Sequence, residues 1–321
     1  MRVTRLACAL LAALLLWPVP HARAADKLRV VLDWFVNPDH GPLVIAREKG
    51  YFRDAGLDVD LIAPADPNDP PKLVAAKQAE IAVSYEPQLH LQVDQGLPVT
   101  RIGTLIGTPL TCLLSLGDGP VQTLKDLKGR KVGFSVAGTE EALLGTMLAT
   151  VGLKLEDVQL IDVNFNLVPS LMSGQVDAVM GAFRNVEAIQ VGLMGRPAHP
   201  FFPEENGVPP FDELIYIAHQ DSLGDARLRG FLQAVERATL WIENHPGEAW
   251  DTFKATDRQL DNELNQRSWL ATLPRWAPSP AALDHGRYAR FAAFLKDKGL
   301  IKATPPVETY AVDPFAPTPK G

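Results

Sequence analysis

The sequence lacks the features typical of nucleic-acid-binding, membrane-spanning and disulfide-rich proteins. Its 321 residues include only two cysteines, Cys8 and Cys112, and no block of basic residues. Acidic side chains outnumber basic ones by 38 to 31, which gives a formal net charge of −7. Because nucleic-acid binding requires clustered Lys and Arg, we expect no nucleic-acid partner. The composition, with 46% hydrophobic and 21% charged residues, is that of a globular protein long enough for two lobes.

The longest apolar run, residues 6–17, is too short to cross a hydrocarbon core of about 30 Å. Arg2 and Arg5 precede this run, and the small-residue motif ARA follows it at 22–24. We therefore expect residues 1–24 to be a signal peptide and the mature protein to be periplasmic, rather than anchored in the membrane. Its removal takes away three of the 31 basic residues and leaves 28 against 38 acidic ones.

The sequence also lacks the common catalytic and metal-binding motifs. It has no GxSxG, HExxH, CxxC or Walker loop, and its histidines show no metal-ligand spacing. After removal of the signal peptide Cys112 is the only cysteine, so no disulfide can form, and its apolar neighbours predict a buried structural thiol. We expect no enzymatic activity, no cofactor and no metal.

Strands alternate with helices along the first two thirds of the chain, which predicts an α/β fold with mixed, mostly parallel sheets. Strands are expected at 28–33, 57–63, 81–84, 99–106, 131–135, 158–163, 176–181 and 212–219. Helices are expected at 42–49, 72–78, 139–151, 168–174, 226–244, 247–254, 257–273 and 281–298. The pattern restarts after residue 121, so we expect two lobes, each with its own sheet and flanking helices.

The predicted division of the chain follows from that restart. Residues 25–112 form the first part of lobe 1, 113–212 form lobe 2, and 213–303 return to lobe 1 with the last strand and the C-terminal helices. Crossings near 110–116 and 205–215 would act as a hinge. Residues 304–321 hold five prolines and are expected to form a strap or tail outside the core.

Ligands of open α/β sheets bind beyond the carboxyl ends of the strands. The loops after four predicted strands carry the candidate ligand-binding residues, which are Trp34, Asn37, His40, Tyr85, Glu86, Gly138, Thr139, Phe183 and Glu187. Aromatic rings, carboxylates and amides suit a flat, nitrogen-rich, neutral or cationic ligand.

Each candidate also has a purely structural interpretation. Trp34 and Tyr85 fit packing roles, and Asn37 and His40 fit caps of the following helix. The glutamates fit solvated surface positions, and the Gly-Thr pair fits a simple turn.

The segment LDWFVNPDHGPLVIAREKGYFRDAGLDVDL, with its D-W-x-x-N-x-x-H signature, resembles periplasmic proteins that bind thiamine pyrimidine precursors. These proteins have the type II periplasmic binding fold, with the ligand between the lobes, and are similar to the fungal synthases of the thiamine pyrimidine. AEIAVSYEPQ, LKDLKGRKVGFSVAGTEEALL, GQVDAVMGAFRNVEAIQ and GVPPFDELIY extend the resemblance to about residue 219.

The resemblance implies that Trp34 and Tyr85 stack on the pyrimidine and that Asn37, His40 and Glu187 approach its polar edge. Gly138 and Thr139 would lie near its substituent. It further implies a monomeric binding subunit of an ABC importer, with a membrane permease and an ATPase as partners.

Three alternatives stay open at this point. Relatives of this fold bind alkyl sulfonates, taurine, nitrate or riboflavin, although the carboxylates of the candidate loops disfavour a sulfonate. Synthase activity is a second alternative, but the fungal enzymes carry a cysteine-rich motif with a metal requirement that this sequence lacks. A sensory or adaptor subunit is the third.

Overall fold

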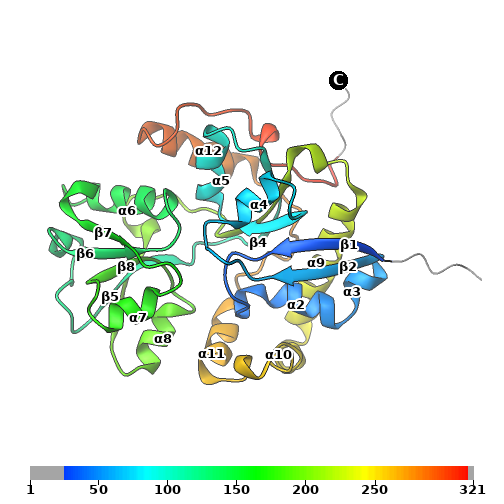
Figure 1. Cartoon of the computed structure of the whole chain (residues 1–321), viewed down its shortest axis with the longest axis horizontal. Helices are drawn as coiled ribbons and strands as arrows, with labels where there is room; N and C mark the ends of the chain where they lie inside the picture. Colours follow the sequence, from blue (N-terminus) through cyan, green and yellow to red (C-terminus); the bar gives the residue numbers. More distant parts are fainter. Residues whose placement is uncertain (1–24, 317–321) are drawn as a thin grey trace, which may run out of the picture.

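The computed structural model describes residues 25–316 and shows two lobes, each built on a five-stranded sheet (Figure 1). The predicted signal peptide lies outside the described residues, as does the end of the tail from residue 317. No helix within 25–316 is long and apolar enough to cross a membrane.

The sheet of lobe 1 has the order β2-β1-β3-β10-β4. Its strands are β1 (Asp26–Val31), β2 (Leu57–Ile62), β3 (Ile81–Ser84), β4 (Val99–Ile106) and β10 (Leu214–His219). β1 pairs in parallel with β2 and β3, whereas β10 runs antiparallel between β3 and β4. β3, β4 and β10 are buried along their whole length, because helices cover both faces, and this explains the apolar runs in β3 and β10.

Lobe 2 repeats this arrangement, with the order β7-β6-β8-β5-β9. The strands are β5 (Thr111–Leu116), β6 (Lys131–Phe134), β7 (Gln159–Asp162), β8 (Ala178–Phe183) and β9 (Ala198–Phe201). Here β5 is the antiparallel strand, between β8 and β9. Two mixed, mostly parallel sheets with flanking helices confirm the predicted α/β, two-lobe architecture.

The helices of the first part of the chain are α2 (Gly41–Glu48), α3 (Tyr51–Asp54), α4 (Pro70–Ala75), α5 (Glu86–Asp94), α6 (Thr139–Ala149), α7 (Leu167–Met172) and α8 (Glu187–Leu193). The last third contributes α9 (Ala226–Asn244), α10 (Pro246–Lys254), α11 (Glu263–Thr272) and α12 (His285–Asp297). α9 is amphipathic: Asp225 caps its start, and its apolar face, including Phe231 and Val235, enters the core of lobe 1.

Two sequence-based expectations for lobe 2 differ from the structure. The segment expected to cross between lobes at 110–116 is largely strand β5, and the crossing is the shorter piece 107–110. From sequence alone, an apolar strand in the middle of a sheet resembles a buried linker when the strands that pair with it are distant in sequence. β9, a short edge strand containing Pro200, was not predicted, because proline and short length hide a strand pattern.

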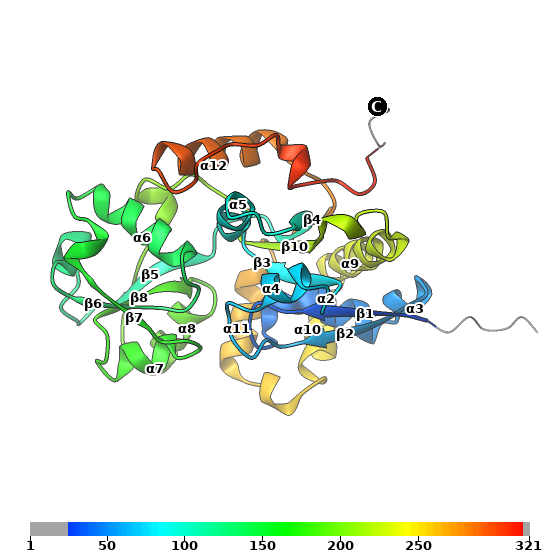
Figure 2. The same cartoon turned by 45° about the horizontal axis from the view of Figure 1, so that its top comes forward.

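The assignment of 213–303 to lobe 1 alone is wrong for α12. Tyr288 packs in a cluster of lobe 1, whereas Phe291 and Leu295 pack with the core of lobe 2. Figure 2 shows α12 lying across the same side of both lobes.

The expectation that the tail stays outside the core is wrong for its described part. Tyr310 and Ala311 are buried against lobe 1, and the backbone of Arg101 in β4 pairs with Tyr310 and Val312. An extended segment of this kind gives no periodic signal, so its docking depends on the exposed edge of β4.

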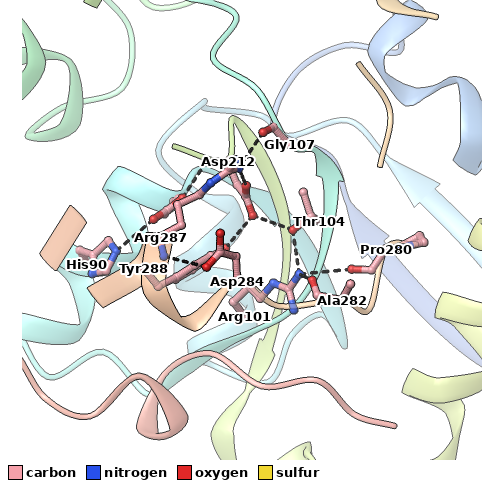
Figure 3. Close-up of polar contacts among 11 residues, drawn as sticks. His90, Arg101, Thr104, Gly107, Asp212, Pro280, Ala282, Asp284, Arg287 and Tyr288 are labelled. Atoms are coloured by element: carbon pink, nitrogen blue, oxygen red, sulfur yellow. Dashed lines mark hydrogen bonds and ion pairs between the residues drawn. The ribbon is translucent and has the colours of Figure 1, made fainter. Parts of the chain in front are cut away.

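A buried polar cluster holds the two crossings to lobe 1 (Figure 3). Asp212, in the second crossing, accepts hydrogen bonds from the Thr104 hydroxyl at 2.8 Å and the Tyr288 hydroxyl at 3.2 Å. Arg287 of α12 pairs with Asp212 and donates to the carbonyl of Gly107 at 2.7 Å. α12 is thereby hydrogen-bonded to both crossings.

Candidate functional site

The lobes enclose a cleft between them with two adjoining hollows. The first has about 370 Å³ of space not filled by atoms, and the second about 310 Å³. Five residues line both hollows, which are Tyr85, Val136, Glu140, Gly181 and Phe183. The first hollow is also lined by Asp33, Trp34, Asn37, Leu167, Val186 and Glu187.

Aromatic rings line the first hollow from both lobes. Trp34 and Tyr85 follow β1 and β3 of lobe 1, and Phe183 ends β8 of lobe 2. The Trp34 ring meets Phe165 of lobe 2 edge-on, with ring centroids 4.6 Å apart. Since loops at the carboxyl ends of strands in both lobes supply rings, the cleft can hold a flat ligand by its faces.

Asp33 positions the lobe 1 side of this hollow. Its carboxylate accepts a hydrogen bond from the Tyr85 hydroxyl at 3.1 Å and lies 2.9 Å from His40 Nε2. The backbone N–H of Asn37 donates to His40 Nδ1 at 3.3 Å, so Nε2 is the ring nitrogen that carries the proton toward Asp33. His40 thus orients Asp33, and Asp33 orients the Tyr85 ring.

Two glutamates line the lobe 2 side. Glu187 begins α8 and accepts a hydrogen bond from the Phe183 N–H at 2.7 Å, while Glu140, in the first turn of α6, accepts one from the Ser135 N–H at 2.8 Å. Glu140 packs directly over Gly181, where φ is +89° and a Cβ would lie 2.1 Å from Oε1 of Glu140. Only glycine combines that backbone conformation with so close an approach.

Burial shifts the titration of these carboxyl groups toward the neutral form. It raises the pKa of Glu187 to about 7, although the Phe183 N–H opposes this. Burial also raises the pKa of Glu140 well above its usual value and that of Glu213, in the second hollow, to about 7. A ligand that donates hydrogen bonds or carries positive charge would favour their ionised form.

Cationic side chains are missing from this lining. Neither hollow is lined by Lys, Arg or His in the described part of the chain. Arg184 directly follows the lining residue Phe183, but it does not line either hollow. Its guanidinium pairs with Glu204 at 2.7 Å and lies over the ring of Phe202. Within residues 25–316, no group of three His, Cys, Asp or Glu side chains is arranged to hold a metal ion.

The lobes contact each other on two sides of the cleft. From lobe 1, the Asn68 amide donates to the Ser135 carbonyl at 3.1 Å and accepts from the Ala137 N–H at 2.9 Å. From lobe 2, Asn185 donates to Asp39 at 2.6 Å. These polar contacts join the two lobes across the cleft.

Most of the candidate residues predicted from sequence converge on the cleft. Trp34, Asn37, Tyr85, Phe183 and Glu187 line the first hollow, and Thr139 lines the second.

Three predicted residues do not line either hollow. His40 is fully buried behind Asp33, so its role is to position that carboxylate. Glu86 is buried in the first turn of α5 and accepts a hydrogen bond from the Asp212 N–H at 2.6 Å, facing the crossings. Gly138 starts α6 with φ +80° beside a separate surface depression.

Sequence reasoning missed Asp33, Glu140 and Gly181 as lining residues. Asp33 was available as the last residue of a predicted strand and the first of the D-W-x-x-N-x-x-H signature. Glu140 directly follows Thr139, but nothing in its sequence position separates a buried first-turn glutamate from a solvated one.

Comparison with known proteins places this cleft in a family. Residues 37–249 match the profile of the family described as "NMT1/THI5 like". The chain is 47% identical over 291 residues to a Haemophilus influenzae protein whose name assigns it to thiamine biosynthesis, covering 90% of this chain and 93% of that one.

Two further relatives differ in what they are named for. The formylaminopyrimidine-binding protein of Halalkalibacterium halodurans is 33% identical, covering 76% of this chain and 74% of its own. The 4-amino-5-hydroxymethyl-2-methylpyrimidine phosphate synthase THI13 of Saccharomyces cerevisiae is 27% identical, covering 77% and 76%.

A solved structure supports the fold. The alkanesulfonate-binding protein SsuA of Xanthomonas axonopodis pv. citri superimposes with a TM-score of 0.71, covering 90% of this chain and 99% of that one at 15% identity. The two-lobe architecture is that of type II periplasmic binding proteins. With a matched profile across both lobes and close relatives over most of its length, the chain belongs to the NMT1/THI5-like family.

Proposed function

We propose that this protein is the substrate-binding subunit of an ABC importer and captures a thiamine pyrimidine precursor in the periplasm by closure of its two lobes. The observation that carries the proposal is the cleft lined by Trp34, Tyr85 and Phe183 together with Asp33, Glu140 and Glu187, and by no cationic side chain. The name of the H. halodurans relative, a formylaminopyrimidine-binding protein, supports the same ligand class.

The chemistry of an aminopyrimidine matches this lining. Its flat ring offers two apolar faces to the aromatic side chains, and its amino group donates hydrogen bonds that carboxylates accept. A thiamine pyrimidine has about ten heavy atoms, and at roughly 1 kcal/mol each the dissociation constant would reach tens of nanomolar. Because the lining comes from both lobes, the full set of contacts forms only on closure, and this difference between open and closed forms drives the movement.

An anion is the rival cargo that the fold itself suggests, since the SsuA structure shares this architecture. A sulfonate or nitrate needs N–H donors or positive charge, whereas no Lys, Arg or His among the described residues lines either hollow. Taurine and riboflavin are tested alongside, because the fold accommodates varied ligands.

Pyrimidine phosphate synthesis is the rival activity, suggested by the relatives named as synthases. The described residues offer no metal-binding cluster, and the buried Cys112 thiol, whose pKa burial raises, is a poor nucleophile. These features favour binding without chemistry. As part of the same proposal, the protein acts as a monomer and delivers its ligand to a membrane permease with its ATPase.

Calorimetric titration of the chain from Ala25 onward tests the proposal. The panel is formylaminomethylpyrimidine, hydroxymethylpyrimidine, thiamine, taurine and riboflavin, with Trp34→Ala alongside. We expect one pyrimidine to bind tightly and to lose most of its affinity in the variant. Binding of an anion or flavin with no pyrimidine bound would refute the proposal, and turnover of the ligand seen by mass spectrometry would indicate an enzyme.

A further inference from the structure

We infer that Asp39 of lobe 1 and Asn185 of lobe 2 form a latch that takes up a proton when the lobes close, so that ligand capture weakens as the pH rises. Both are positioning residues, because neither lines a hollow of the cleft and both act through the contact between the lobes. The inference rests on the proposed function and adds a regulation of the same cleft by protons.

The latch lies where the 3₁₀ turn Pro38–His40 of lobe 1 meets the turn between β8 and α8 of lobe 2. The Asn185 amide nitrogen donates to Asp39 Oδ1 at 2.6 Å and to the Thr272 hydroxyl at 2.8 Å. Thr272 ends α11, a helix that packs in the core of lobe 1 through Trp269. Separation of the lobes would therefore break both hydrogen bonds of Asn185.

Two oxygens of this contact have no hydrogen-bond partner among the described residues. Asp39 Oδ2 and Asn185 Oδ1 are both buried and unpaired, although they belong to the two groups that the 2.6 Å bond joins. Asp39 is fully buried and Asn185 is 2% exposed, so water does not reach this contact freely. Leaving two buried acceptors unpaired is unfavourable.

A single proton resolves both vacancies. While Asp39 is ionised, its Oδ2 and the Asn185 Oδ1 are both acceptors, so neither can pair with the other. A proton taken from solvent onto Asp39 Oδ2 makes that oxygen a donor, and Asn185 Oδ1 is the unpaired acceptor on the joined amide. The carboxylic acid and the amide then form two hydrogen bonds, one in each direction.

The surroundings of Asp39 favour its neutral form. Burial raises the pKa of this carboxyl to about 6, and the negative charge of Asp33 acts in the same direction. Asp39 and Glu187, which begins α8 of lobe 2, also repel each other, since the charge of Asp39 raises the pKa of Glu187. Asp39 thus faces a carboxyl group from each lobe.

The groups that favour the ionised form do not cancel this effect. His40 and the hydrogen bonds from Asn185 and Thr272 oppose the rise in the pKa of Asp39, which still reaches about 6. Arg275, just beyond α11, attracts Asp39 electrostatically, but Asp39 Oδ2 has no hydrogen bond from its guanidinium.

Lobe closure changes the protonation of Asp39. With the lobes apart, Asn185 uncovers the carboxyl, and its pKa falls toward the ordinary value of about 4. Between this value and about 6 the open form is ionised and the closed form is protonated, so closure takes up a proton. Above this range closure buries a charged carboxylate beside an unpaired amide oxygen. The contribution of the latch to closure is therefore present at low pH and is lost as the pH rises through about 6.

Calorimetry at about pH 5 and about pH 8 tests the latch, with formylaminomethylpyrimidine as the probe. Titrations in two buffers of different ionisation enthalpy give the number of protons taken up on binding. Asp39→Asn replaces the acid proton with an amide N–H, and Asn185→Ala removes the latch. Asp58→Asn, at an exposed position of β2, makes the same charge change and serves as the matched control.

We expect Asp39→Asn to bind like wild type at about pH 5 and about tenfold more tightly than wild type at about pH 8. At about pH 5 wild type should take up most of one proton more than this variant. The comparison removes the titration of the ligand itself. Asn185→Ala should bind about tenfold more weakly than wild type at about pH 5, without the extra proton uptake, and Asp58→Asn should match wild type at both pH values.

Small-angle scattering of the ligand-free proteins tests the latch without a ligand. The radius of gyration of wild type should be smaller at about pH 5 than at about pH 8, whereas that of Asp39→Asn should be the same at both.

The outcomes separate the latch from the proposed function. Equal pH dependence of affinity and equal proton uptake in wild type and Asp39→Asn would overturn the latch, while pyrimidine binding itself would uphold the proposed function. If the pyrimidine binds at neither pH, the proposed function fails and scattering decides the latch. The same change of radius with pH in wild type and Asp39→Asn, or no change in either, would then overturn it.

Discussion

Replacement of Glu187 by Gln is expected to remove a pH dependence of the free energy of unfolding that arises from the burial of this carboxyl in the cleft. Burial raises the pKa of this carboxyl from 4.5 to about 7 in the folded chain. Below pH 4.5 both folded and unfolded forms hold the proton, so the shift has no effect. Between these two values the folded form keeps the proton while the unfolded form releases it, so raising the pH favours unfolding.

The magnitude follows from the size of the shift. Each unit of pKa difference corresponds to about 1.4 kcal/mol, so the free energy of unfolding falls by about 3 kcal/mol between pH 4.5 and pH 7 through Glu187 alone. Above pH 7 the loss is complete and constant. Gln does not titrate, and its amide oxygen can still accept the 2.7 Å hydrogen bond from the Phe183 N–H.

Urea unfolding of the ligand-free protein at about pH 5 and about pH 8 measures this difference. Relative to wild type, Glu187→Gln should gain about 3 kcal/mol of stability across that interval, since groups that do not interact with residue 187 titrate alike in both proteins. Glu243→Gln, at an exposed position of α9, serves as the matched control and should follow wild type. A Glu187→Gln variant with the wild-type pH slope would refute the argument that the cleft holds a neutral carboxyl.

Three further predictions concern the cleft. Trp34→Ala removes a lining ring and should weaken pyrimidine binding by about 100-fold in calorimetry, whereas an unchanged affinity would place the ring elsewhere. Asn68→Ala removes both of its contacts across the cleft and should lower ligand affinity about tenfold while leaving the thermal unfolding temperature nearly unchanged, and small-angle scattering should show a more open unliganded form. Gly181→Ala places a Cβ against Glu140 at φ +89° and should destabilise the fold by about 2 kcal/mol or more, an expectation that wild-type stability in urea would contradict.

The strands of this fold could be predicted from sequence because both sheets are covered by helices. The apolar run 81–84 has the bounds of β3, and the segment 99–106, rich in β-branched residues, has those of β4. The predicted helix 226–244 matches α9 because its capping Asp225 and its apolar period agree. The helix expected at 257–273 is divided at Asn262, which caps α11. Helix α5 was missed because its first turn, with Glu86 and Pro87, resembles a polar loop.

The direction in which a side chain points could not be predicted. His40 and Glu86 follow the expected strands, yet each is engaged by a buried partner, Asp33 for His40 and the Asp212 backbone for Glu86. The docking of α12 on both lobes and of Tyr310 on lobe 1 also depends on surfaces that exist only after folding. The sequence therefore predicts which residue types lie at the carboxyl ends of the strands. It does not predict which of them contact the ligand and which support the residues that do.

A crystal structure of the chain from Ala25 onward with formylaminomethylpyrimidine tests the central claim most directly. We predict that the ring lies in the first hollow against Trp34 and Tyr85, with its amino group toward the carboxylates and its substituent in the second hollow. Ligand bound outside the cleft between the lobes, or a cleft without ligand at saturating concentration, would contradict the account.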